Sequence, residues 1–426
     1  MNICMFTNTY LPHVGGVANS VATLAADLAA DDHKLLIIAP EYPGQTPAQE
    51  GVEVFRVTAI QNFNGSDFSV RLPFSFTLKD RIEAFAPDII HSHHPFLLGD
   101  SALRAAKQQV VPIVFTHHTL YERYTHYVPL DSKPMKKFVI NLSTSYANMC
   151  HRVIAPSRSI ADLLREREVR RPVTEIPTGV DLDFYESGNG GEFRRKNNIP
   201  PERFVLGHVG RLAPEKNLDY LATAAVSWLR QNDNTVFLVV GDGPAAPAMQ
   251  DRFTAAGLTD RVFFTGKLTG QAISDAYNAM DLFGFSSQSE TQGMVLAEAM
   301  AAGLPVVALD GPGVREVVSD GENGRLLPAD AASENFAAAL AELTEKKENQ
   351  RCARNARQTA DHFSREKCAG RVVELYRAAI SDFAADKGQT DEEMISWTSL
   401  LRSIKTEWDL LSQKTEAVLE AFKPDY

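Results

Sequence analysis

Two carboxylates lie eight residues apart, at Glu290 and Glu298, with Gly293 between them. The surrounding residues predict the end of a strand, a loop that carries Glu290, and a helix that starts at Gly293 and carries Glu298. The free amides at a helix start attract anions, so a phosphate can bind there. Acids on either side of that phosphate can hold hydroxyl groups. The spacing therefore predicts a site for a nucleotide-sugar, with ribose, diphosphate and sugar in a row.

A pair of cations follows an expected strand at residues 204–210. Arg211 and Lys216 lie five residues apart, across a turn that enters a helix. Two fixed cations at the carboxyl end of a strand can neutralise a leaving diphosphate without a metal ion. The alternative is a surface arginine and lysine at a helix start, where the helix dipole disfavours positive charge.

Two glycine-rich turns can bring the backbone close to a ligand. Gly15 and Gly16 follow the first expected strand, and Gly241 and Gly243 follow a later one. Paired glycines leave amides free for a phosphate, although the first turn can equally be an ordinary tight connection. The second turn matches the dinucleotide-binding pattern, but that pattern normally follows the first strand of its domain. We therefore interpret it as the lining of a base or sugar pocket rather than as a nicotinamide site.

Histidines cluster after two expected strands, at His91, His93, His94, His117 and His118. They are candidate metal ligands, but no carboxylate lies at a convincing spacing from them. Hydrogen bonding to sugar hydroxyls is the favoured interpretation. The acidic pair at positions 181 and 183 does not directly follow a strand, so we expect amides and cations to bind the diphosphate, and no metal.

The elements that must position these residues alternate short apolar runs with amphipathic helices. This pattern predicts parallel sheets covered on both faces, with ligands bound beyond the carboxyl ends of the strands. Helices are expected, for example, at residues 217–230 and 332–344. The expected strands are residues 2–7, 34–39, 52–57, 88–92, 111–116, 152–155, 173–176, 204–210, 235–241, 262–265, 281–285 and 305–308.

The predicted fold is α/β, with two doubly wound Rossmann-like domains that face each other across a cleft. The first domain is expected at residues 1–185 and the second at 199–364, joined through a Gly-, Asn- and charge-rich stretch. The helix near 365–384 is expected to return to the first domain. Residues 385–426 are expected to form a helical extension, either packed on the first domain or used for self-association, rather than a membrane-surface or partner-binding helix.

The composition and charge of the chain argue against several classes of protein. The chain has 426 residues and a net charge of −11, which argues against general nucleic-acid binding. It has no apolar run of about 18 residues, as a membrane span would require, and its N-terminus lacks the basic region of a signal peptide. The four cysteines are scattered and are expected to be reduced thiols of a cytosolic protein.

The ordered set of motifs resembles the retaining glycosyltransferases of family 4, which have the two-domain GT-B fold. No single motif is specific, but their order covers both predicted domains. The matching segments are Gly15-Gly16, Thr116-His117-His118-Thr119, Ile176-Pro-Thr-Gly179-Val-Asp181, Gly210-Arg211 with Lys216, Gly241-Asp-Gly243-Pro, and Glu290 to Glu298 with Gly303-Leu-Pro305-Val.

The resemblance implies a role for each of these residues. Arg211 and Lys216 would bind the donor diphosphate, Glu290 the hydroxyls of the donor sugar, and Glu298 the ribose. His118 would contact the donor sugar near its anomeric carbon. Glycines and amides that would line the donor site, with Gly15 and Gly16 on the phosphate or acceptor side, are Gly15, Gly16, Gly210, Gly243, Gln292, Gly293, Met294 and Val295.

The resemblance also implies a mechanism. No protein nucleophile is placed in this family: the acceptor attacks the front face of the sugar, and the leaving diphosphate takes its proton. An α-linked UDP-sugar, expected to carry glucose, then gives an α-linked product. No tightly bound cofactor and no metal ion are required.

A closer branch is suggested by Glu290-Thr-Gln-Gly293, which replaces the commoner Glu-x-Phe-Gly, and by the aromatic segment after His118. Both resemble the diacylglycerol glucosyltransferases. This implies a lipid acceptor and a cytoplasmic protein that binds peripherally to the inner face of the membrane, through a basic and apolar patch at residues 133–138. The alternatives are a soluble sugar or sugar-phosphate acceptor, or a nucleotide-sugar-binding protein without turnover. The acceptor-side candidates are Tyr121, Tyr124, His126 and Tyr127.

Overall fold

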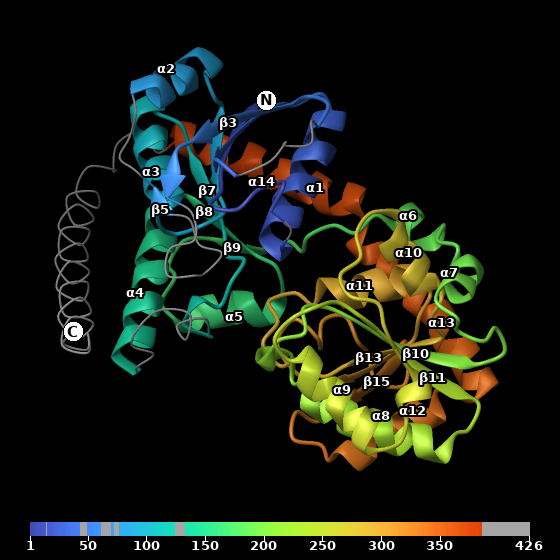
Figure 1. The fold of residues 1–426 in the computed structure, drawn as a ribbon. Coiled ribbons are helices and arrows are strands. Elements are labelled where there is room, and N and C mark those ends of the chain that lie inside the picture. The colour runs from blue at the N-terminus through green and yellow to red at the C-terminus, as the bar shows by residue number, and fades with distance from the viewer. Residues whose placement is uncertain (14, 43–48, 61–69, 72–75, 124–132, 386–426) are drawn as a thin grey trace, which may run out of the picture.

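The protein has two lobes, each built on its own parallel sheet (Figure 1). The structure, a computed structural model, describes residues 1–13, 15–42, 49–60, 70–71, 76–123 and 133–385. The expected α/β fold with two doubly wound sheets is confirmed. The predicted extension at 385–426 lies, from residue 386 onward, outside the described residues.

The first lobe contains a seven-stranded sheet of order β3-β2-β1-β6-β7-β8-β9, whose neighbouring strands all pair in parallel. Its strands are β1 (Asn2–Phe6), β2 (Lys34–Pro40), β3 (Val52–Val57), β6 (Ile89–Ser92), β7 (Ile113–Thr116), β8 (Arg152–Ala155) and β9 (Val173–Glu175). Its helices are α1 (Gly16–Ala30), α2 (Phe76–Phe85), α3 (Leu98–Gln109), η2 (Tyr121–Arg123), α4 (Lys133–Met149), α5 (Arg158–Glu166) and α14 (Arg365–Ala385). A short antiparallel pair, β4 (Ala59–Ile60) and β5 (Val70–Arg71), stands apart from the sheet.

The second lobe contains a six-stranded parallel sheet of order β12-β11-β10-β13-β14-β15. Its strands are β10 (Phe204–Val209), β11 (Thr235–Val240), β12 (Val262–Phe264), β13 (Leu282–Phe285), β14 (Val306–Leu309) and β15 (Gly324–Leu327). Its helices are α6 (Leu182–Glu186), α7 (Gly190–Lys196), η4 (Pro214–Lys216), α8 (Leu218–Gln231), α9 (Ala246–Ala255), η5 (Thr259–Arg261), α10 (Gln271–Asn278), α11 (Met294–Ala301), α12 (Ser333–Glu342), α13 (Lys346–Ala360) and η6 (Asp361–Phe363).

Each sheet is buried on both faces, as parallel sheets require. Strand β11 is buried at all six positions because apolar clusters cover it on either side. In α8, buried residues recur every three or four positions, at Leu218, Leu221, Ala225 and Leu229, so one face of the helix packs on the sheet. This packing holds the carboxyl ends of the strands, and the loops that follow them, in fixed positions.

Two segments cross between the lobes side by side. Val180 donates its N–H to the Phe363 carbonyl at 2.7 Å, and the Arg365 N–H returns to the Val180 carbonyl at 3.2 Å. Gly179 is needed at this crossing, because a Cβ there would lie 2.6 Å from the Arg365 Cα. After the crossing, α14 packs on α1, and Tyr376 joins the core of the first lobe.

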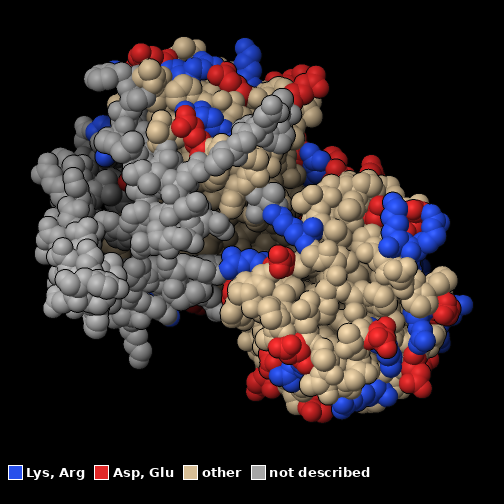
Figure 2. Space-filling model, viewed as in Figure 1, with Lys and Arg blue, Asp and Glu red and all other residues tan. Residues whose placement is uncertain are grey.

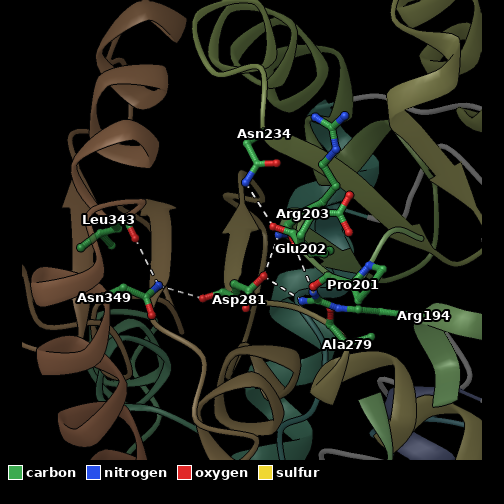
Figure 3. Close-up of polar contacts among 10 residues, drawn as sticks. Arg194, Pro201, Glu202, Arg203, Asn234, Ala279, Asp281, Leu343 and Asn349 are labelled. Atoms are coloured by element: carbon green, nitrogen blue, oxygen red, sulfur yellow. Dashed lines mark hydrogen bonds and ion pairs between the residues drawn. The ribbon is translucent and has the colours of Figure 1, made fainter. Parts of the chain in front are cut away.

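The charge-rich stretch between the expected domains is more ordered than its composition indicates. Residues of this stretch form α7, which packs on α10. Arg194 of α7 donates to the Asp281 carboxylate at 2.8 Å and to the Ala279 carbonyl at 2.8 Å (Figure 3). Asp281 also accepts the Val205 N–H at 2.8 Å, so Arg194 ties this stretch to the start of the second sheet.

Candidate active site

The carboxylate Glu290 and the cation Lys216 meet in the second lobe. Lys216 ends η4 after β10, and Glu290 lies in the loop after β13, the neighbouring strand of the sheet. Their Nζ and Oε1 atoms are 2.6 Å apart, and both side chains remain about one-fifth exposed. Because parallel strands end at one edge of a sheet, these two loops converge where a ligand is expected.

The helix start predicted at Gly293 is present. Gly293 caps α11 with φ of 71°, a backbone conformation that favours glycine. A Cβ at this position would lie 2.9 Å from the Gly313 carbonyl oxygen, so the loop also needs glycine for space. The first amides of a helix have no acceptor within the helix. The amides of Met294 and Val295, in the first turn of α11, therefore suit a bound anion.

Glu298 occupies a different environment from Glu290. The Tyr277 hydroxyl donates to Glu298 Oε2 at 2.7 Å. Burial raises the pKa of the Glu298 carboxyl, and hydrogen bonds from Tyr277 and Tyr185 oppose that rise. Glu298 and Met294 line a cavity of about 320 Å³, whose other wall includes Asn19 of α1. A partly buried acceptor at the edge of a cavity suits a ligand hydroxyl.

The loops that follow β10 and β11 support each other. The Ala245 N–H donates to the Leu212 carbonyl at 2.8 Å, and the Leu212 N–H donates to the Asp242 carbonyl at 2.9 Å. Gly243 has φ of 152°, and a Cβ there would collide with the Leu212 carbonyl. The glycine pattern thus buttresses the loop that carries Arg211, whose side chain is half exposed and lies 3.8 Å from Glu215. Gly210, next to Arg211, donates its N–H to the Val240 carbonyl at 3.0 Å.

His118 lies in the first lobe and is held by another histidine. Its Nε2 lies 2.9 Å from the Nδ1 of His93, and the two rings stack. Burial holds the pKa of both imidazoles well below the ordinary value, so both are neutral near pH 7. The His93 Nε2 is buried and has no hydrogen-bond partner among the described residues. His118 can therefore offer a neutral imidazole to a ligand.

The remaining histidines of the cluster use hydrogen bonds within the protein. His91 bonds the Tyr376 hydroxyl at 2.6 Å and Thr116 Oγ1 at 2.7 Å, and His94 Nδ1 lies 3.1 Å from the Asn8 nitrogen. Burial lowers the pKa of His91 to about 3. Both ring nitrogens of His91 thus have partners within the protein, which leaves neither for a sugar hydroxyl. For His94 the role toward sugar hydroxyls stays a prediction. Across the described residues, no group of three or more His, Cys, Asp or Glu is arranged to hold a metal ion.

The loop that follows Glu290 reaches into the first lobe. Thr291 Oγ1 donates to the His118 carbonyl at 2.9 Å. The Gln292 side chain accepts the Thr178 N–H at 2.7 Å and donates to the Thr178 carbonyl at 2.8 Å. Thr291, which follows Glu290 in the second lobe, thus contacts the backbone of His118 in the first lobe. Figure 2 shows Lys and Arg side chains at the crevice where the lobes meet.

The first-lobe candidates are placed unevenly. Gly15 caps α1 in an extended conformation, and Gly16 has open space where a side chain would be. The Tyr121 ring packs edge-on against the rings of Phe96 and His117, so these contacts fix its position. Tyr124, His126 and Tyr127 lie outside the described residues. The described part of α4 includes the basic residues Lys136 and Lys137.

Sequence reasoning missed the partners that orient these groups, namely Tyr277, Thr178 and His93 as the support of His118. Tyr277 lies on α10 and Thr178 in the crossing segment, so neither belongs to a motif that names its partner. The histidine cluster was a visible signal for His93, but its pairing with His118 depends on how two strands are aligned.

Two family models together match most of the chain. Residues 190–359 match the model for "Glycosyl transferases group 1", and residues 14–184 match the model for "Glycosyltransferase Family 4". None of the described helices has the length and apolar character that a membrane crossing requires.

Named relatives and solved structures are similar over most of their length. The chain is 31% identical over 333 residues to an alpha-monoglucosyldiacylglycerol synthase of Streptococcus pneumoniae, which covers 76% of this chain and 75% of that protein. It is 30% identical over 365 residues to a GDP-mannose-dependent alpha-mannosyltransferase of Mycobacterium tuberculosis, covering 84% and 92%. The fold is similar to that of HepE of Anabaena, crystallised with UDP, with a TM-score of 0.71, 21% identity, and coverage of 89% and 100%.

Proposed function

The chain belongs to glycosyltransferase family 4, and from that premise we propose that it transfers a hexose from a UDP-sugar to a lipid hydroxyl with retention of the α configuration. The observation that carries this proposal is the Lys216–Glu290 pair beside the start of α11. We assign residues 199–364 to the donor side. Residues 1–185, apart from α6, which packs on the second lobe, form the acceptor side together with the helix that returns to them.

The donor diphosphate would bind between the cations and the helix start. The Lys216 ammonium, which donates to Glu290 at 2.6 Å, would place a fixed positive charge beside the phosphate oxygens. Arg211 adds a second fixed charge, and the first amides of α11 add dipoles that point at the anion. These groups would stabilise the negative charge that develops on the leaving diphosphate. Glu298 would accept hydrogen bonds from the ribose.

The transfer step would take place on one face of the donor sugar. The acceptor hydroxyl attacks the anomeric carbon as the bond to the diphosphate breaks, and a diphosphate oxygen takes the hydroxyl proton. Glu290 holds hydroxyls of the sugar, and neutral His118 donates or accepts a hydrogen bond near the anomeric carbon. Retention follows because attack and departure share a face.

A lipid acceptor is supported by the Glu290-Thr-Gln-Gly293 loop and by the similarity to an alpha-monoglucosyldiacylglycerol synthase. We propose diacylglycerol or a related lipid, reached by a cytoplasmic enzyme that binds peripherally to the inner face of the membrane. Lys136 and Lys137 on α4 would contribute positive charge to that contact. Self-association through residues 385–426 stays a prediction.

The proposal is tested by a nucleotide-release screen. UDP-glucose, UDP-galactose and GDP-mannose are each offered with diacylglycerol-containing vesicles, with glucose, and with a sugar phosphate. We expect UDP release from UDP-glucose only with the vesicles, and an α-linked glycolipid by NMR. Transfer only to a soluble acceptor would contradict the lipid assignment, and release of GDP alone would contradict the donor assignment.

A further inference from the structure

The loop after Glu290 makes an unusual reciprocal contact with the other lobe. One side chain, Gln292, both accepts the Thr178 N–H at 2.7 Å and donates to the Thr178 carbonyl at 2.8 Å. This uses both ends of the amide, as a neighbouring strand would. Only 5% of Gln292 is exposed, so its polar atoms depend on these bonds. The contact joins residues 114 positions apart in the chain.

Thr178 is well placed to transmit this contact. It lies two residues before Val180, where the chain crosses between the lobes. Its hydroxyl pairs with Ser20 Oγ of α1 at 2.7 Å. A hydrogen bond to Thr178 therefore fixes the second lobe against both the crossing segment and α1.

Thr291, the residue before Gln292, makes a further hydrogen bond to the first lobe. Thr291 Oγ1 donates to the carbonyl of His118 at 2.9 Å. Glu290, which pairs with Lys216, comes directly before Thr291 and Gln292 in the chain. Gly293, which caps the start of α11, comes directly after them. The Thr291 bond thus joins the donor loop to the loop that carries His118, and the Gln292 bonds join the donor loop to Thr178.

We propose that Thr291 and Gln292 are positioning residues that hold the donor loop against the His118 loop and against Thr178, so that donor sugar and acceptor lobe are aligned for transfer. This inference rests on the proposed function for its catalytic part. The two residues act through Glu290 and His118 and need no contact with substrate. Separation of the lobes would break all three hydrogen bonds, because each one joins the donor loop to the other lobe or to the crossing segment.

The test separates alignment from donor binding. Gln292→Ala removes both bonds to Thr178. Gln292→Glu keeps an acceptor for the Thr178 N–H but places a carboxylate beside the Thr178 carbonyl. Thr291→Val removes the hydroxyl, and Thr291→Ser restores it. Gln288→Ala is the matched control, because Gln288 lies in the same loop and donates to the Ala329 carbonyl of its own lobe.

We expect Gln292→Ala to lower kcat by about 10- to 100-fold, since small misplacements of reacting groups are costly. The Kd for UDP should change by less than about 3-fold, because the donor groups remain. Thr291→Val should lower kcat as well, Thr291→Ser should recover it, and Gln288→Ala should match the wild type. An equal loss of kcat and UDP affinity in Gln292→Ala would overturn the inference, as would an unchanged kcat.

Small-angle X-ray scattering gives a readout that is independent of turnover. We expect Gln292→Ala to have a larger radius of gyration than the wild type, because the lobes separate more often. If the wild-type enzyme transfers no sugar to any acceptor, the proposed function fails, but this comparison still decides the cross-lobe contact. Identical scattering of the two proteins would then overturn it.

Discussion

Two carboxylates of one loop and helix have opposite electrostatic surroundings. Glu290 pairs with Lys216 at 2.6 Å, and its side chain stays partly exposed. Glu298 lies under Tyr277 and Tyr185, where burial disfavours its charge. The proposed function gives the two groups different tasks: the lysine-paired carboxylate would bind sugar hydroxyls, and the sheltered one would bind the ribose.

The raised pKa of Glu298 predicts a pH-dependent cost to folding. In the unfolded chain the carboxyl ionises near its ordinary pKa of about 4.3. In the folded protein its pKa is higher, so the native state holds the proton longer and loses stability as pH rises from about 4.3 through the folded pKa. Glu298→Gln cannot ionise and escapes this loss. Urea unfolding from pH 4.5 to 8 should show the variant gaining free energy of unfolding relative to the wild type, whereas a constant difference would contradict the assignment.

At this scale the sequence predicted the charged groups but not all their partners. Spacing alone indicated Glu290, Glu298, Arg211 and Lys216, because strand ends and a helix start are local signals. The side-chain role of Gln292 was missed, since only its backbone amide was expected to act. Its partner lies 114 residues away in another lobe, and no local pattern encodes that distance.

Among the elements, the loop after β11 has the clearest structural reason for its glycines. Gly241 and Gly243 both lie against backbone of the loop that carries Arg211. Side chains there would push the two loops apart. The glycine pattern that resembles a dinucleotide-binding turn is therefore explained by close backbone contact.

A matched pair of substitutions tests this explanation. Gly243→Ala adds a Cβ that collides with the Leu212 carbonyl, whereas Gly257→Ala adds one at a positive φ of 70° with nothing within 4 Å. Both carry backbone strain, but only the first displaces the Arg211 loop. We expect Gly243→Ala to lower the free energy of unfolding by about 2 kcal/mol more than Gly257→Ala in urea titrations, and to lower kcat/KM. If both variants lost the same free energy of unfolding, the claim that Gly243 supports the Arg211 loop would be wrong.

Most elements could be predicted because their apolar runs are long and regularly separated. The expected strands coincide with twelve of the sheet strands to within about two residues. The exception in the two parallel sheets is β15, whose four residues Gly324–Leu327 include an arginine and form no apolar run. Helix α7 was also missed, because it has no apolar period. Instead, Arg194 ties it to the Ala279 carbonyl and the Asp281 carboxylate, which no local pattern predicts.

In the whole molecule, the lobes are joined at several separate points. The backbone of Val180 pairs with the segment before α14, and the side chains of Thr291 and Gln292 bond across from the donor loop. Glu316 also accepts the Ser159 N–H of α5 at 2.7 Å. Two lobes were predictable from the repeated βα pattern. Their relative placement was not, because it depends on hydrogen bonds between residues that no sequence period connects.

The central claim is that a UDP-sugar donor is held at the Lys216–Glu290 pair during transfer. It is tested most directly by measuring UDP release from UDP-glucose with diacylglycerol-containing vesicles, for the wild type, Lys216→Ala and Lys347→Ala, an exposed lysine of α13. We expect Lys216→Ala to lose about 100- to 1,000-fold in kcat/KM, because a fixed charge at the leaving diphosphate is removed, and Lys347→Ala to match the wild type. A Lys216→Ala enzyme that releases UDP at the wild-type rate would contradict the account.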